Sequence, residues 1–158
     1  METLNFLIDG FTVALTLENF TLALIGCILG TIFGALPGLG PANGVAILIP
    51  LSFSLGLSPA SSMILLASVY YGAMYGGRIS SILLNIPGDE PAMMTCLDGY
   101  PMTKQGRAGE ALTLTGLASF FGAIFATIGL VLLAPQLVKV ALLFGPVEYF
   151  ALFVMAFA

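Results

Sequence analysis

The stretch "GTIFGALPGLGPANG", residues 30–44, interrupts a strongly apolar part of the chain with five glycines and two prolines. Proline cannot donate a backbone hydrogen bond and glycine readily adopts positive φ, so a helix that enters this stretch should end at Pro37. Irregular backbone is not tolerated against lipid. We therefore expect this break to be buried in protein or to line a water-filled cavity.

The chain as a whole is far more apolar than a water-soluble domain. Of its 158 residues, 59% are hydrophobic and 8% are charged, with a mean hydropathy of +1.09, whereas soluble domains carry about 25% charged residues. Residues 19–77 contain no charge, and at about 1.5 Å per residue they could cross a ~30 Å hydrocarbon core nearly three times. Residues 111–138 form a second such run, long enough for one tilted crossing. These patterns predict an all-α, polytopic membrane protein.

The Gly/Pro pattern divides this predicted transmembrane domain, residues 1–158, into segments. The expected pieces are an interfacial helix in 1–18, a span and a broken or re-entrant segment in 20–57, a span and a second broken segment in 59–97, a solvent-facing loop in 98–110, and further spans in 111–158 interrupted at Pro135 and at Gly145-Pro146. The final run is still apolar at Ala158, so we expect the N-terminal part of a longer protein. The acidic start predicts no cleaved signal peptide, and the two basic residues of the 98–110 loop favour the cytoplasmic side.

The small numbers of basic, histidine and cysteine residues exclude several classes of function. Four basic residues do not form a nucleic-acid-binding patch. The absence of histidine excludes histidine metal sites and histidine-dependent triads from this sequence. Cys27 and Cys96 suggest neither a disulfide nor a CxxC site. We expect no metal centre and no cofactor.

Glycines recur every fourth residue in the first predicted span, at Gly26, Gly30 and Gly34. This spacing exposes bare backbone along one helix face, which lets a second helix approach closely. We interpret Gly26 and Gly30 as packing residues.

Two Gly/Pro-rich interruptions, residues 37–44 and residues 76–81 running on to 85–88, offer backbone N–H and C=O groups that a regular helix would bond internally. We expect helix N-termini near residues 38–43 and 77–81. A helix that starts after a break directs N–H groups and a positive dipole end at that point, which favours an anion, and unwound carbonyls suit a small cation. Discontinuous helices of this kind hold substrate and ion near the midplane of secondary transporters. The candidate binding residues are Gly38, Gly40, Asn43, Gly77, Arg78, Ser80, Ser81 and Asn85, and the candidate helix breaks are Gly30, Gly34, Pro37, Pro41, Gly76, Pro87 and Gly88.

Charged and aromatic residues near these breaks have alternative roles. Arg78 can grip a carboxylate with two hydrogen bonds or snorkel to lipid headgroups. Asp89 and Glu90 can bind a cation or cap a helix, and capping or solvation is favoured over cation binding. The tyrosines of residues 70–75 favour the interfacial belt over ligand binding.

Four segments together resemble the large membrane subunit of the tripartite tricarboxylate transporters. They are "GTIFGALPGLGPANG", "YYGAMYGGRISSILLNIPGDEP", "LDGYPMTKQGRAGEAL" and "LLAPQLVKVALLFGPVEYFAL". The resemblance implies a multi-pass secondary transporter of the bacterial inner membrane, not an enzyme. Its substrates would be di- or tricarboxylates such as citrate, taken up with a cation gradient of Na⁺ or H⁺. Its partners would be a small membrane subunit and a periplasmic solute-binding protein, and this chain would be the first of two similar halves.

The resemblance also places the family's signature on particular residues. The glycine–proline signature falls on Gly30, Gly34, Pro37, Gly38, Gly40 and Pro41, and a second stretch falls on Tyr75, Gly76, Gly77, Ser80, Ser81, Asn85, Pro87 and Gly88. Members often have small or hydroxyl residues where Arg78, Pro91, Ala92 and Cys96 stand here. These departures imply a shifted substrate preference.

Two alternatives stand beside the transporter. A membrane-embedded aspartyl protease would use Asp89 and Asp98, which must then lie close enough to share a proton. A non-transporting membrane scaffold would not need two broken segments with unsatisfied backbone groups.

Overall fold

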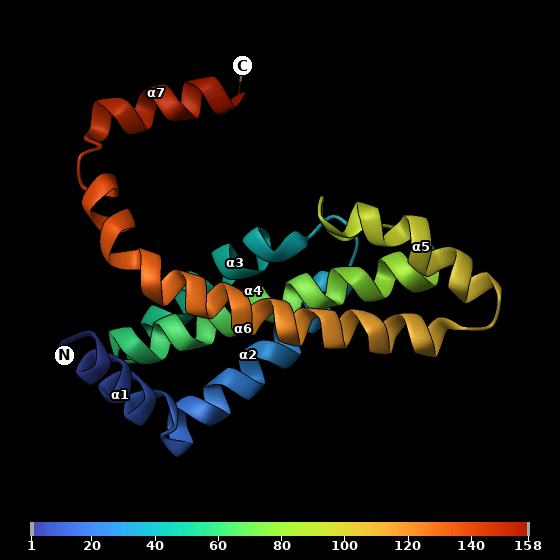
Figure 1. Ribbon diagram of the computed structural model, residues 1–158, viewed down its shortest axis with the longest axis horizontal. Coiled ribbons are helices and arrows are strands. Elements are labelled where there is room, and N and C mark those ends of the chain that lie inside the picture. Colours follow the sequence, from blue (N-terminus) through green and yellow to red (C-terminus); the bar gives the residue numbers. More distant parts are fainter. Residues whose placement is uncertain (1, 158) are drawn as a thin grey trace. The chain divides into compact units, whose positions relative to one another are not determined.

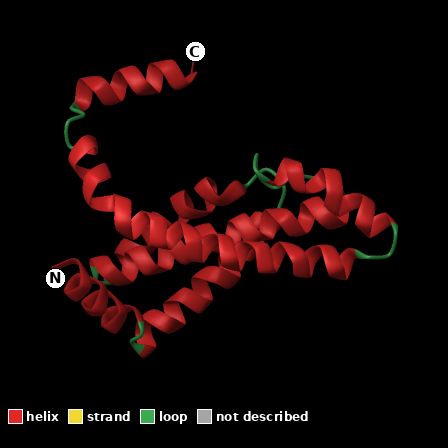
Figure 2. Cartoon of the chain, in the orientation of Figure 1, coloured by secondary structure: helices red, strands yellow, loops and turns green. Residues whose placement is uncertain are grey.

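The computed structural model describes the backbone of residues 2–157 and the side chains of residues 7–134 and 136–155. Within this range the chain is helical with short connections and has no strand (Figure 1, Figure 2). The helices are α1 (Glu2–Ala14), α2 (Leu17–Ala35), α3 (Gly40–Ser54), α4 (Pro59–Leu84), α5 (Ala92–Lys104), α6 (Ala108–Ala141) and α7 (Pro146–Phe157). The all-α prediction is confirmed.

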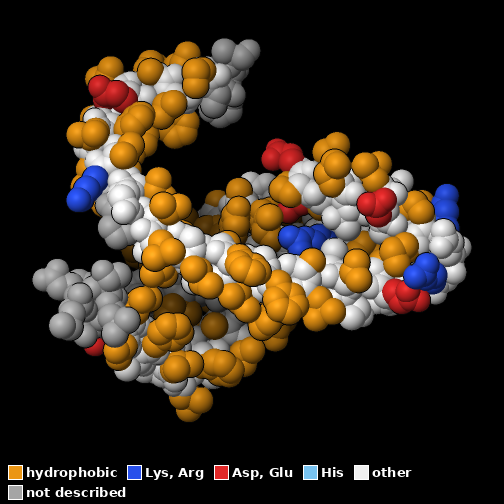
Figure 3. All heavy atoms as spheres, viewed as in Figure 1, with side chains coloured by type: hydrophobic (Ala, Val, Ile, Leu, Met, Phe, Trp, Pro, Cys, Tyr) orange, Lys and Arg blue, Asp and Glu red, His pale blue; other side chains and the backbone are white. Residues whose placement is uncertain are grey.

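Two compact parts divide the chain, Met1–Gly116 and Leu117–Ala158, and their boundary lies within α6. In the first part, α2, α3 and α5 all pack on α4. The second part contains the rest of α6 and α7, with an edge-to-face pair formed by Phe120 and Phe121. Hydrophobic side chains cover most of the surface visible in Figure 3, and charged ones are few.

Helix α4 is the centre of the first part. It starts where the Ser58 hydroxyl accepts a hydrogen bond from the Ser61 N–H at 3.1 Å, with Pro59 in the first turn. It ends at Asn85, which caps it in the left-handed conformation at φ 59°. Its buried positions include Val69 and Ala73, both fully inaccessible.

Glycines make the contact between α2 and α4 a contact of backbones. A Cβ on Gly26, Gly30 or Gly34 would overlap the main chain of α4, and a Cβ on Gly72 or Gly76 would overlap the main chain of α2. The predicted packing face of α2 is thus confirmed, and α4 supplies a matching one. Gly30 and Gly34 lie inside α2 and do not break it.

The first predicted break lies where the sequence places it. Helix α2 ends at Ala35, residues 36–39 form a turn, and α3 begins at Gly40. Gly38 and Gly40 have φ values of 90° and 62°, which L side chains disfavour. The combination of Pro37 with these glycines ends one helix and starts another.

Two prolines lie inside helices without interrupting them. Helix α3 continues through Pro50, so residues 40–54 are not a broken segment, while the re-entrant alternative for this part of residues 20–57 stays a prediction. Helix α6 likewise continues through position 135 to Ala141. A proline removes one intrahelical hydrogen bond, and apolar flanks of good helix formers can continue past it. At 15 residues, α3 is about 22 Å long, still shorter than a ~30 Å core.

The expected break at Gly76–Ser81 was also wrong. These residues lie in the interior of α4, which runs unbroken for 26 residues. The glycines there serve close approach, because a Cβ on Gly76 would overlap the Thr31 carbonyl of α2. The second break follows instead at residues 85–91, where the sequence also places Asn85, Pro87 and Gly88.

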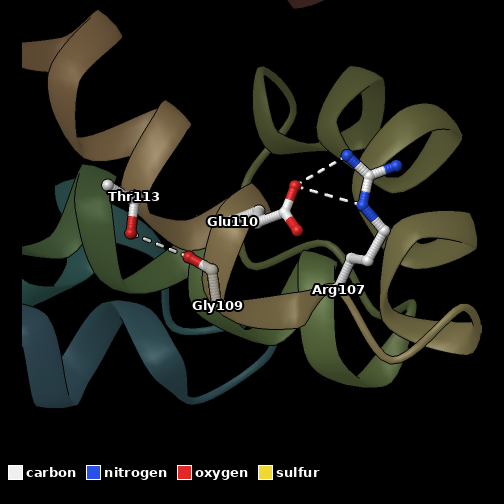
Figure 4. Close-up of polar contacts among 4 residues, drawn as sticks. All are labelled: Arg107, Gly109, Glu110 and Thr113. Carbon is white, nitrogen blue, oxygen red and sulfur yellow. Dashed lines mark hydrogen bonds and ion pairs between the residues drawn. The ribbon is translucent and has the colours of Figure 1, made fainter.

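Residues 98–104 belong to α5, and the connection to α6 is only residues 105–107, so the predicted loop over 98–110 was too long. Gly106, at φ 78°, ends α5 with its N–H donating to the Thr103 carbonyl at 2.9 Å. Arg107 then pairs with Glu110 at 2.6 Å, and the Thr113 hydroxyl bonds the Gly109 carbonyl (Figure 4). The hydrogen bond and charge of Glu110 raise the pKa of Arg107 above its usual value.

Among the described residues, Leu17–Ala35 and Ala108–Ala134 are long and apolar enough to cross a membrane. Helix α4 has the length but is rich in glycine, serine and tyrosine, which fits a helix surrounded by other helices. The helix expected near the N-terminus is present as α1, and its interfacial location stays a prediction.

Candidate functional site

A cavity of about 530 Å³ lies between the start of α3 and the α4–α5 connection. Segments from both Gly/Pro-rich breaks line it, together with one face of α4. The lining residues are Gly38, Leu39, Gly40, Pro41, Ala42, Asn43, Tyr70, Met74, Pro87, Gly88, Asp89, Glu90, Pro91 and Met93. The two breaks, far apart in the sequence, therefore form one site.

The first wall is the N-terminus of α3. Leu39 is its N-cap residue and offers no side-chain hydrogen bond, and a proline stands in the first turn. The first-turn N–H groups of a helix have no partner within the helix, and here no side chain of the described residues caps them. Asn43, exposed and one turn into the helix, adds a side-chain amide beside them. This wall carries the partial positive charge of the helix dipole.

The second wall is the connection of residues 87–91. Gly88 is buried against α4 and α2, because a Cβ there would come within 2.6 Å of both the Gly77 Cα and the Gly34 carbonyl oxygen. Only glycine allows this close approach, which places the next residue, Asp89, at the edge of the cavity.

Asp89 has two oxygens in different situations. Its Oδ1 accepts a hydrogen bond from the Ala92 N–H at 2.9 Å and so caps α5. Its Oδ2 is buried and has no hydrogen-bond partner among the described residues. The carboxylate lies over Gly77, where a Cβ would be 3.5 Å from both oxygens. The favoured capping role is confirmed for Asp89, and no side chain or backbone group of the described residues donates to its second oxygen.

The two walls therefore differ in charge. The start of α3 favours an anion, while Asp89 and Glu90 place carboxylates on the opposite side of the same cavity. An arrangement of this kind suits an organic anion and a small cation bound side by side.

The structure brings only part of the predicted site together. Gly38, Gly40 and Asn43 line the cavity with the predicted break residues Pro41, Pro87 and Gly88, whereas Gly77, Arg78, Ser80, Ser81 and Asn85 do not. The expected helix N-terminus at Gly77–Ser81 does not exist, because these residues lie within α4.

Each of these residues has another place in the fold. The buried hydroxyls of Ser80 and Ser81 both donate to the Gly77 carbonyl, at 3.0 and 2.7 Å. Asn85 ends α4 and is exposed. Arg78 is half-buried in α4, away from the cavity lining. Asp98, the second member of the alternative aspartyl pair, is exposed on α5 and does not line the cavity either.

Sequence reasoning missed which part of α4 lines the cavity, because it favoured the interfacial belt for the tyrosines of residues 70–75. Tyr70 and Met74 are four residues apart and so share one face of the helix. That spacing was visible in the sequence, but it could not show that this face meets the start of α3. Met93, in the first turn of α5, completes the lining.

The tripartite tricarboxylate transporter TctA family matches residues 20–158. The chain belongs to this family. The match includes both walls of the cavity and agrees with the resemblance of the sequence segments. Together with the two apolar helices it identifies a membrane protein of a transporter family.

Two curated relatives are similar to the chain. One, from Agrobacterium vitis, is described as an uncharacterized 52.8 kDa protein in the TAR-I ttuC' 3' region; it is 46% identical over 155 residues, which cover 98% of the chain and 30% of the relative. The other, an uncharacterized protein of Methanocaldococcus jannaschii, is 32% identical over 108 residues, covering 68% of the chain and 26% of the relative. The chain thus spans less than a third of either relative. No solved structure is significantly similar to it.

Proposed function

We propose that the chain forms part of the membrane subunit of a secondary transporter that takes up small organic anions. The substrates are di- or tricarboxylates such as citrate, and uptake is driven by a gradient of Na⁺ or H⁺. The subunit crosses the bacterial inner membrane several times and works with a small membrane subunit and a periplasmic solute-binding protein. Membership of the TctA family supports this reading.

The observation that carries the proposal is the cavity shared by the two Gly/Pro breaks. One wall is a helix N-terminus without a side-chain cap, which suits a substrate carboxylate. The amide of Asn43 is placed to donate a further hydrogen bond to that group. Gly38 and Gly40 keep the approach free of side chains.

The coupling cation is assigned to the opposite wall. Asp89 there has one oxygen that caps α5 and another that is without a hydrogen-bond partner among the described residues. A carboxylate oxygen left in this condition is costly unless a cation or proton satisfies it. Backbone carbonyls of the 85–91 connection and the carboxylate of Glu90 are available as further oxygen ligands.

The remaining surface fits a larger assembly. In the first part, Phe20, Ile28 and Ile32 of α2 are all more than half exposed. Lipid or further helices must cover such a surface in a membrane protein. The proposal is that this chain is the first of two similar halves, with the cavity completed at their interface.

Uptake of radiolabelled citrate by cells that produce the full-length gene product with its neighbouring genes tests the proposal. Asn43→Ala should lower the apparent affinity by about tenfold, the effect of one hydrogen bond to a charged group. Ser81→Ala is the matched control, because Ser81 is buried outside the cavity. Normal uptake by Asn43→Ala, or equal losses in both variants, would contradict the site. No uptake of any carboxylate by the unsubstituted protein would contradict the function.

A further inference from the structure

Helix α4 ends with a buried carbonyl that its own helix cannot satisfy. The last carbonyls of a helix lack intrahelical donors, and Ile82 lies in the final turn of α4, before the left-handed Asn85. Ile82 is fully inaccessible, so water cannot replace the missing donor. The hydroxyl of Thr103 on α5, 21 positions along the chain, donates to the Ile82 carbonyl at 2.7 Å.

Helix α5 is shaped to reach this carbonyl. Gly99 lies one turn before Thr103, and a Cβ on Gly99 would be 2.7 Å from the Ile82 Cγ1. The missing side chain lets α5 approach Ile82 closely enough for the hydroxyl to bond. The Gly99 carbonyl, at 3.2 Å, is a longer and alternative acceptor of the same hydroxyl within α5.

The unit formed by the 85–91 connection and α5 is thus tied to α4 at two places. At its cavity end, Gly88 packs on Gly77, and Asp89 caps the first turn of α5 through the Ala92 N–H. At the far end of α5, Thr103 ties the helix back to α4. Because Asp89 is bonded to the first turn of α5, a displacement of α5 relative to α4 would also move Asp89 relative to Gly77, and the bond from Thr103 to Ile82 opposes such a displacement.

We propose that Thr103 is a positioning residue that fixes the acidic wall of the cavity. Thr103 is not among the residues that line the cavity, and its hydroxyl bonds the carbonyls of Ile82 and Gly99, so it acts by holding α5 and therefore the 85–91 connection. The effect on cation binding rests on the proposed function, in which this wall binds the coupling cation. The structural part, the restraint of residues 85–91, is independent of what is transported.

Thr103→Val in the full-length protein, purified in lipid nanodiscs, tests the restraint. Valine keeps the shape of threonine and removes only the hydroxyl. Amide hydrogen exchange in peptides covering residues 85–92 should become about three- to tenfold faster, the range expected for one lost hydrogen bond. Thr103→Ser should restore the slow exchange. Thr113→Val is the control, because the Thr113 hydroxyl donates to the Gly109 carbonyl of its own helix and, among the described residues, to no other helix (Figure 4).

The same variants are then compared in citrate uptake at varied Na⁺ concentration and pH. Thr103→Val should raise the half-saturating cation concentration several-fold while membrane abundance and the maximal rate stay near those of Thr113→Val. Unchanged exchange in residues 85–92 would overturn the positioning role whatever the transport result. Faster exchange with an unaltered cation dependence would overturn the link to the cavity. If the unsubstituted protein does not take up citrate or any other carboxylate, the proposed function is contradicted. The hydrogen-exchange result would still test the positioning role of Thr103.

Discussion

Gly34 of α2 lies directly against the backbone of Ala73 in α4, so that a Cβ on Gly34 would overlap the Ala73 carbonyl. Ala73 is itself fully inaccessible. The same relationship repeats one turn earlier between Gly30 and Val69. The distance between the two helices is therefore fixed by main chain on both sides, without a flexible side chain that could move aside.

Gly34→Ala should consequently destabilise the protein. The added methyl group must push α2 away from α4, at a cost of about 2 kcal/mol or more. Thermal stability of the detergent-solubilised full-length protein, followed by size-exclusion chromatography after heating, measures the effect. Gly122→Ala on α6 is the control, since a Cβ there meets nothing within 4 Å. Equal melting of the two variants would mean that the helices do not approach this closely.

Gly38→Ala tests backbone strain separately from crowding. A Cβ on Gly38 has no neighbour within 4 Å, but its φ of 90° is unfavourable for an L residue. We expect a cost of roughly 1–2 kcal/mol and a shift of the turn that starts α3. Citrate uptake should fall more than in Gly10→Ala, where a Cβ is likewise unopposed and no such φ applies. If the two variants transport alike, the turn does not position the cavity.

Asn85→Gly separates a structural role from a binding role. Glycine accepts the left-handed conformation that Asn85 adopts at φ 59°. Uptake and abundance should therefore stay close to those of the unsubstituted protein. Asn85→Val should lower abundance, because a β-branched residue is strained at this φ. Loss of uptake in a stable Asn85→Gly variant would instead indicate that the Asn85 side chain binds substrate or ion.

Asp89→Asn should uncouple stability from cation binding. Asparagine keeps an oxygen that can accept the Ala92 N–H, so α5 stays capped. It removes the negative charge, and the half-saturating Na⁺ concentration should rise by about tenfold or more. Asp89→Ala should show the same change and, in addition, a loss of about 1 kcal/mol from the missing cap. An unchanged cation response in Asp89→Asn would place the coupling ion elsewhere.

The sequence predicted the all-α class and the first break, because Pro37 between closely spaced glycines leaves a helix few alternatives. It could not separate the two uses of glycine. Gly76 and Gly38 carry the same local signal, yet Gly76 lies in a continuous helix that needs close packing against Thr31, whereas Gly38 forms a turn. The difference depends on a neighbour distant in the sequence.

For the same reason, only some of the predicted binding residues line the cavity. Gly40 and Asn43 follow a local break and were found from local residues. Ser80 and Ser81 were expected beside them, but their hydroxyls turn inward to the Gly77 carbonyl. Helix α2 covers the glycine face of α4, so a different face of α4 is left to meet the start of α3. The sequence of α4 alone does not indicate which face that is.

The contact between α2 and α4 also constrains how the chain is made. Helix α2 leaves the ribosome before α4, and its glycine face lacks its α4 partner until the segment that ends at Gly76 has followed. At about 5–20 residues per second this interval lasts a few seconds. During biogenesis the glycine face of the newly inserted α2 must therefore be covered by lipid or by the insertion machinery until α4 is inserted. Delayed release of α2 from that machinery would favour correct pairing of the two helices.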